Sequence, residues 1–153
     1  MRYRLTPFIT ILLTLSMALG CASAPMATPE RDMTAKAFSS IADKAVVYIY
    51  RDENFGGAVK IPIIVNSRII GDTVAKSYFR IVLDPGPCEV QCKAESDSRQ
   101  SFQTEAGKVY FLRQEMKMGM FVAGCMMHLI PEAEGRMAIA RCKLLEAPET
   151  IPK

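Results

Sequence analysis

The sequence predicts a mainly β protein, a small antiparallel β-sandwich with one C-terminal helix. Three observations carry this prediction. Short runs of β-branched and aromatic residues recur between residues 45 and 130. Turn residues separate these runs at fairly regular intervals, as they do in sandwiches. Only one late segment, starting at Pro131, has apolar residues at helical spacing.

The first predicted strands come from composition. Residues 45–50, Ala-Val-Val-Tyr-Ile-Tyr, form a β-branched and aromatic run, and residues 61–65 form another. Asn66 and Ser67 follow as a plausible hairpin turn into a third strand at residues 68–70.

The fourth predicted strand, residues 77–83, alternates strictly. Phe79, Ile81 and Leu83 share one face, and Tyr78, Arg80 and Val82 share the other. The sequence Asp-Pro-Gly at 84–86 follows. Proline fixes φ and glycine allows a positive φ, which predicts a type II turn that reverses the chain.

The later strands are predicted in two pairs. Residues 88–93 pair with 101–104, and after a turn at Gly107 a long strand covers 109–118, with 120–130 continuing the pattern. The helix then begins at Pro131, has acidic residues in its first turn, and places Met137, Ala140 and Leu144 on one face.

The N-terminus is predicted to be an export signal. Arg2 and Arg4 precede a mostly apolar stretch from residue 7 to 19, which is too short for a membrane-spanning stop-transfer helix. Residues 1–20 are therefore expected to be a lipoprotein signal peptide. An uncleaved anchor and plain secretion remain the alternatives, because short apolar N-termini serve all three fates.

Cys21 is the predicted lipidation site. Residues 18–21, Ala-Leu-Gly-Cys, resemble a lipobox, although Ala18 stands where leucine is usual. The competing site at 22–24 is followed by Pro25, whose ring makes a poor scissile bond. The covalent lipid is the only cofactor expected. Because no aspartate follows Cys21, the resemblance to Gram-negative lipoproteins implies an outer-membrane protein facing the periplasm.

Composition predicts one domain after this anchor. Residues 21–43 are expected to be the lipidated N-terminus and a linker, in which residues 22–32 form a spacer rich in Ala, Pro and Thr. Residues 44–146 are expected to form the single β-rich domain, and residues 147–153 a loose tail. The signal carries two of the 19 basic and none of the 16 acidic residues, which leaves 17 minus 16, or +1. This balance argues against nucleic acid as a partner.

Four motifs carry a resemblance to a known family: residues 46–51 (VVYIYR), 77–80 (SYFR), 84–86 (DPG) and 107–115 (GKVYFLRQE). In this order they resemble the bacterial lipoprotein family called domain of unknown function 2846, over about residues 44–145. Members often have a histidine after the Pro-Gly turn, where this chain has Pro87 and Cys88. The resemblance implies a β-sandwich-like fold and an envelope location, and it implies no known reaction.

Without Cys21, four cysteines remain, an even number that favours two disulfides in an oxidising compartment. On an extended strand, Cys88 and Cys92 share a face but lie roughly 13 Å apart, beyond the ~7 Å that a disulfide allows. Each is therefore expected to bond separately to Cys125 or Cys142. A redox-active or metal-binding thiol pair is the alternative, although Cys-x-x-Cys spacing is missing.

Two sets of residues are candidate sites. Met116, Met118, Met120, Cys125 and His128 are soft ligands suited to Cu(I), but alternating methionines are also common in cores. Arg51, Arg80 and Arg113 end or interrupt apolar strands. They either converge to hold an anionic group or a partner's carboxylates, or simply face solvent and pair with nearby acids.

The function predicted from these features is a non-enzymatic envelope lipoprotein, a binding or assembly module with an envelope protein partner. His128 is the only histidine, and no serine or cysteine motif marks a nucleophile for it. Soft-metal or redox handling is the alternative.

Overall fold

The structure is a computed structural model, and it describes residues 24–54, 59–118, 123–148 and 150–151. The elements are α2 (Pro29–Ala35), β1 (Ala45–Arg51), β2 (Ile61–Val65), β3 (Arg68–Thr73), β4 (Ser77–Leu83), β5 (Gly86–Cys92), β6 (Ser98–Thr104), β7 (Val109–Met118), β8 (Ala123–Ile130), α3 (Glu132–Ile139), β9 (Lys143–Leu144) and β10 (Thr150–Ile151). The predicted mainly β fold with a C-terminal helix is confirmed, and α2 is an additional helix that the sequence analysis missed.

Two sheets face each other. The first has the order β10-β4-β1-β7-β8, with β9 also paired to β4, and the second has the order β3-β2-β5-β6. The second sheet is antiparallel throughout, whereas β1 pairs antiparallel with β4 but parallel with β7. A parallel pair needs a long crossover. Here the chain between β1 and β7 forms β4 of the first sheet and all four strands of the second sheet.

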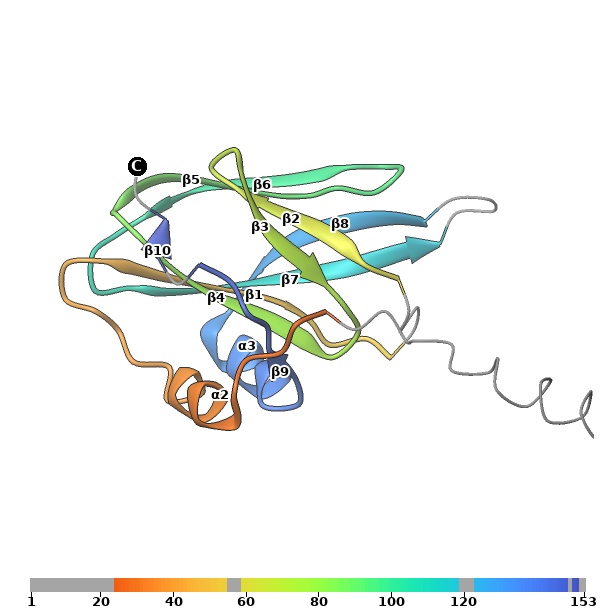
Figure 1. Ribbon diagram of the computed structural model, residues 1–153. Coiled ribbons are helices and arrows are strands. Elements are labelled where there is room, and N and C mark those ends of the chain that lie inside the picture. The colour runs from red at the N-terminus through yellow and green to blue at the C-terminus, as the bar shows by residue number, and fades with distance from the viewer. Residues whose placement is uncertain (1–23, 55–58, 119–122, 149, 152–153) are drawn as a thin grey trace, which may run out of the picture.

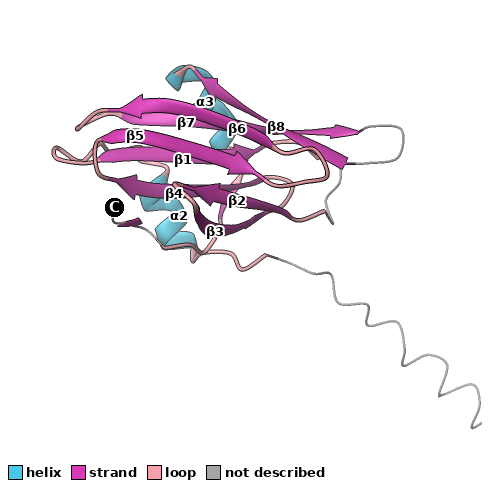
Figure 2. Ribbon diagram, turned by 90° about the horizontal axis from the view of Figure 1, so that it is seen from above, coloured by secondary structure: helices cyan, strands magenta, loops and turns pink. Residues whose placement is uncertain are grey.

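The first sheet is covered on both faces, which makes three layers (Figures 1 and 2). Between the sheets, Val47, Ile49 and Phe79 pack against Ile63 and Val90. On the outer face, side chains from β1, β4 and β7 pack under the two helices: Tyr48, Tyr78 and Phe111 meet Ala35, Ala138 and Ile139. Every residue of β1 is consequently buried.

Two predicted turns have different outcomes. Asn66 and Ser67 both have positive φ (47° and 65°), the geometry of a two-residue hairpin, and they join β2 to β3 as predicted. At residues 84–86 the chain reverses as it crosses from β4 in the first sheet to β5 in the second, so this turn joins the two sheets rather than two paired strands (Figure 1). Gly86 has a φ of 137°, which explains the glycine.

The expected linker is also wrong for the part that the structure describes. Ala24 is buried, Met26 forms a bridge with Leu145, and α2 packs on the sheet through Ala35. The segment is ordered because it buries apolar side chains and forms backbone hydrogen bonds with the chain after α3, such as Ala27 N to Leu144 O (2.9 Å).

The end of the chain departs from prediction in two places. The helix ends at Ile139, so that Leu144 lies in β9 beside β4 rather than on the helix. Residues 150–151 are not loose, because β10 pairs with β4 and buries Ile151. Together β9 and β10 supply hydrogen-bond partners to an edge of β4 that would otherwise be open.

Candidate functional site

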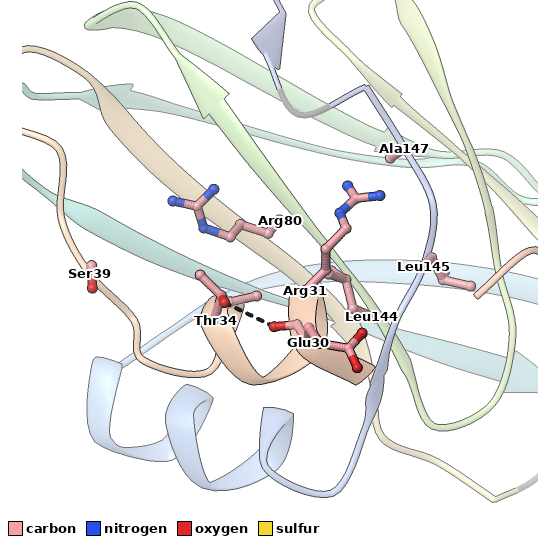
Figure 3. Close-up of a pocket in the computed structure, with 9 residues that line it drawn as sticks. Glu30, Arg31, Thr34, Ser39, Arg80, Leu144, Leu145 and Ala147 are labelled. Carbon is pink, nitrogen blue, oxygen red and sulfur yellow. Dashed lines mark hydrogen bonds between the residues drawn. The ribbon is translucent and has the colours of Figure 1, made fainter. Parts of the chain in front are cut away.

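The outer face of the first sheet carries a cavity. It has a volume of about 330 Å³ and lies between α2, β4 and the chain after β9 (Figure 3). We call it the helix–sheet pocket. It is lined by Glu30, Arg31, Thr34, Ala35, Ser39, Arg80, Leu144, Leu145 and Ala147.

The local sequence explains why α2 forms one wall. Thr28 caps the helix by accepting a hydrogen bond from the Arg31 amide (3.4 Å), Pro29 takes the first helical position, and acidic residues follow in the first turn. Because this pattern is a recognised helix start, it is the signal by which the sequence analysis could have found the wall.

Asp32 fixes α2 to the sheet. Its carboxylate accepts hydrogen bonds from Lys36 Nζ (2.7 Å), Tyr78 Oη (2.9 Å) and the Leu144 amide (2.9 Å). Burial alone would raise the pKa of Asp32, but these three donors together lower it below its ordinary value. One side chain therefore joins the helix, β4 and β9, and it holds the pocket walls in place.

Arg80 supplies the positive charge of the pocket. It lies on β4 directly opposite Tyr48 of β1, whose hydroxyl donates to the carbonyl of Ala35 in α2 (2.6 Å). Burial raises the pKa of Tyr48, and the neighbouring Arg80 counteracts part of this effect. Within the described part of the chain, no carboxylate lies within ion-pair distance of Arg80.

The remaining lining is part polar and part apolar. The hydroxyls of Thr34 and Ser39 come from α2 and the segment after it, whereas Ala35, Leu144 and Leu145 form an apolar surface (Figure 3). Arg31 is already paired, with its Nη1 lying 2.6 Å from Glu146 Oε2. Glu30 adds a carboxylate at the α2 wall (Figure 3). Arg80 is the cation of the lining that can receive an anionic group, and the apolar carbons suit a ligand with an apolar body.

The three candidate arginines do not converge. Arg51 lies on the opposite face of β1, within the sandwich, where it is fully buried and donates to the carbonyl of Val59 (2.9 Å) while its Nε lies 3.7 Å from Glu53. Arg113 shares the outer face with Arg80 but pairs with Glu134 of α3 at 3.4 Å. Of the three, only Arg80 lines this pocket.

The four cysteines in the described part of the chain form one disulfide, not the two predicted. Cys92 of β5 bonds to Cys125 of β8, with their Cα atoms 6.2 Å apart, whereas Cys88 and Cys142 are free and buried. The second predicted bond is wrong because Cys88 lies between the sheets and Cys142 lies beyond the first sheet, under the helices. Burial raises the pKa of each free thiol to about 11, so both stay protonated at neutral pH.

The soft-ligand set is divided as well. Cys125 is committed to the disulfide, and His128 lies on the other face of β8, where its Nε2 is 3.1 Å from Glu115. Met116 is buried beside Arg51. The side chain of Met118 and the whole of Met120 lie outside the described residues. Across the described chain, no three His, Cys, Asp or Glu side chains cluster as metal ligands do.

Cys21, the predicted lipidation site, also lies outside the described residues. Among the helices that the structure does describe, none is both long and apolar enough to cross a membrane.

Comparison with known proteins places the chain in a family. A family model described as "Protein of unknown function (DUF2846)" matches residues 41–125. An uncharacterised protein of Haemophilus influenzae is 35% identical over 126 residues, which cover 81% of this chain and 75% of that protein. No solved structure matches. The chain therefore belongs to the DUF2846 family, as its strand motifs predicted.

Proposed function

We propose that this chain is a lipid-anchored protein of the bacterial envelope, tethered through Cys21, and that its domain is a non-enzymatic binding module. The ligand or partner presents an anionic group to Arg80 in the helix–sheet pocket. The observation that carries the binding role is this arginine, which opens on a cavity of about 330 Å³ and has no carboxylate partner among the described residues.

The polarity of the pocket favours carboxylate or phosphate over a cation. A guanidinium presents planar, paired donors that match such groups, and Ser39 offers a further hydroxyl, whereas the Thr34 hydroxyl already donates to the Glu30 carbonyl (2.9 Å). Copper handling is less well supported, since the disulfide occupies Cys125 and His128 faces the other way. Thiol chemistry is also less well supported, because Cys88 and Cys142 are buried and their thiols are protonated at neutral pH.

Nuclear magnetic resonance titration tests the binding role. The probes are benzoate and, as a neutral control of similar shape, benzamide, added to residues 21–153 carrying Cys21→Ser. We expect benzoate alone to shift the amides of Thr34, Arg80 and Leu145 saturably, and Arg80→Met to abolish the shifts. Arg113→Met is the matched control, because that arginine lies on the same face outside the pocket. Equal effects of both probes, or none, would refute the proposal.

The anchor needs its own test. We expect the wild-type chain to incorporate radiolabelled palmitate and fractionate with the outer membrane, and Cys21→Ser to do neither. Cys88→Ser serves as the control for losing a cysteine. Retention of the Cys21→Ser chain in membranes would show that another feature tethers it.

A further inference from the structure

The described chain is fixed to the domain from its first residue. Ala24 is only 3% exposed, the Pro25 carbonyl accepts the Glu146 amide at 2.9 Å, and Met26 forms a bridge with Leu145. Three peptide units separate Cys21 from Ala24, and a fully extended chain spans at most about 3.6 Å per residue. Ala24 therefore lies within about 11 Å of Cys21.

This reach is comparable to the thickness of the headgroup layer. A bilayer of about 40–45 Å has a hydrocarbon core of about 30 Å, which leaves roughly 5–8 Å of headgroups on each side. If Cys21 carries the acyl chains, as the proposed function requires, no spacer holds the domain clear of this layer. We infer that the end of the domain around Ala24 rests directly on the lipid surface.

The neighbours of Ala24 define this surface, which we call the tether end. A hollow there is lined by Ala24, Pro25, Lys60, Ile70, Gly71, Asp72, Phe79, Leu145 and Glu146. In Figure 1 the described residues begin, in red-orange, beside the arrowhead of β3. Met26 and Val59, the sequence neighbours of Pro25 and Lys60, are also exposed. This end therefore combines exposed apolar side chains with one lysine and two carboxylates, and it is the short tether rather than net charge that brings it to the lipid.

The opposite end of the sandwich is well separated. The hollow at the tether end includes Phe79 of β4, which is opposite Ile49 of β1, whereas the start of β1 meets the turn at residues 105–108 through a hydrogen bond from Gly107 N to Lys44 O. From Ile49 back to Ala45, four residues of β1 span roughly 13 Å at about 3.3 Å each. Ala106, exposed in that turn, consequently stands clear of the bilayer.

The chain contains no tryptophan, so one introduced residue is a unique fluorophore. The experiment compares Lys60→Trp with Ala106→Trp in the full lipidated chain, reconstituted in phosphatidylcholine vesicles that contain some headgroup spin-labelled phosphatidylcholine. We expect several-fold stronger quenching at position 60. Inserting a 20-residue Gly-Ser linker before Ala24, with an end-to-end distance of about 25 Å, should remove most of the difference.

Two failures are distinguishable. If the lipidated, vesicle-bound chain is quenched equally at both positions, the inference is overturned and the anchor stands. If the wild-type chain carries no lipid, the anchor and this inference both fall.

Discussion

The Cys92–Cys125 disulfide joins the two sheets, and its removal has a calculable cost. The bond links β5 of the second sheet to β8 of the first across a sequence separation of 33 residues. In the chain-entropy account, closing a loop of this length lowers the entropy of the unfolded chain enough to stabilise the fold by about 3.7 kcal/mol. With an unfolding entropy of about 2.1 cal/mol/K for each of about 130 residues, reduction should lower Tm by roughly 14 °C.

Denaturant unfolding of residues 21–153 carrying Cys21→Ser, with and without reductant, measures this cost. The matched control is the Cys92→Ala/Cys125→Ala double variant, which should start at the reduced stability and not respond to reductant. Mass spectrometry of the denatured, unreduced chain should count two free thiols, Cys88 and Cys142. Four free thiols, or an unchanged midpoint on reduction, would refute the pairing and the reasoning built on it.

Two further predictions concern the helix layer. Gly135→Ala should destabilise the protein by about 1–3 kcal/mol in chemical denaturation, because the added Cβ would overlap the ring of Phe111. Helix propensity alone predicts the opposite, a gain in stability of about 1 kcal/mol. A variant more stable than wild type would therefore contradict this packing. Asp32 has a lowered pKa in the folded state, so its contribution to stability is complete above its unfolded pKa of about 3.9 and is lost as the pH falls towards the folded value. Asp32→Asn should therefore be less stable than wild type at pH about 6, with a gap that narrows towards pH about 3; a constant gap would argue against the three hydrogen bonds.

Local patterns predicted the strands well. The predicted bounds of β2, β4 and β7 match the structure, since alternation and β-branched composition are properties of the strand itself. The pairing of β1 with β7 was beyond reach, because it joins residues about 60 positions apart through backbone hydrogen bonds that any side chain permits. The disulfide partner of Cys125 was also beyond reach. Cys88 and Cys92 both face the space between the sheets, and only the way the two sheets align places Cys92 rather than Cys88 beside Cys125.

The pocket was harder to predict than the sheet. Arg80 was a candidate because it interrupts an apolar strand, but its role depends on α2, which was read as a spacer from its Ala, Pro and Thr content. Arg51 illustrates the converse. Arg51 lies on the same face of β1 as the buried Val47 and Ile49. From sequence alone, an arginine at the end of a strand is expected to be exposed to solvent, because nothing in the sequence shows that both faces of β1 are covered. Its burial is tolerated because Glu53 and the Val59 carbonyl lie within reach.

The position of the family motifs clarifies what members have in common. The three strand motifs fall on β1, β4 and β7, which are neighbours in one sheet with β1 at the centre. The family match, residues 41–125, therefore covers the frame of the fold. Apart from Arg80, every residue that lines the helix–sheet pocket lies outside that range, in residues 30–39 and 144–147. The match to the Haemophilus influenzae protein covers 81% of this chain, more than the family range, and therefore reaches into the pocket walls as well. A shared fold does not by itself imply a shared ligand, so a ligand found for this chain should be tested anew in each relative.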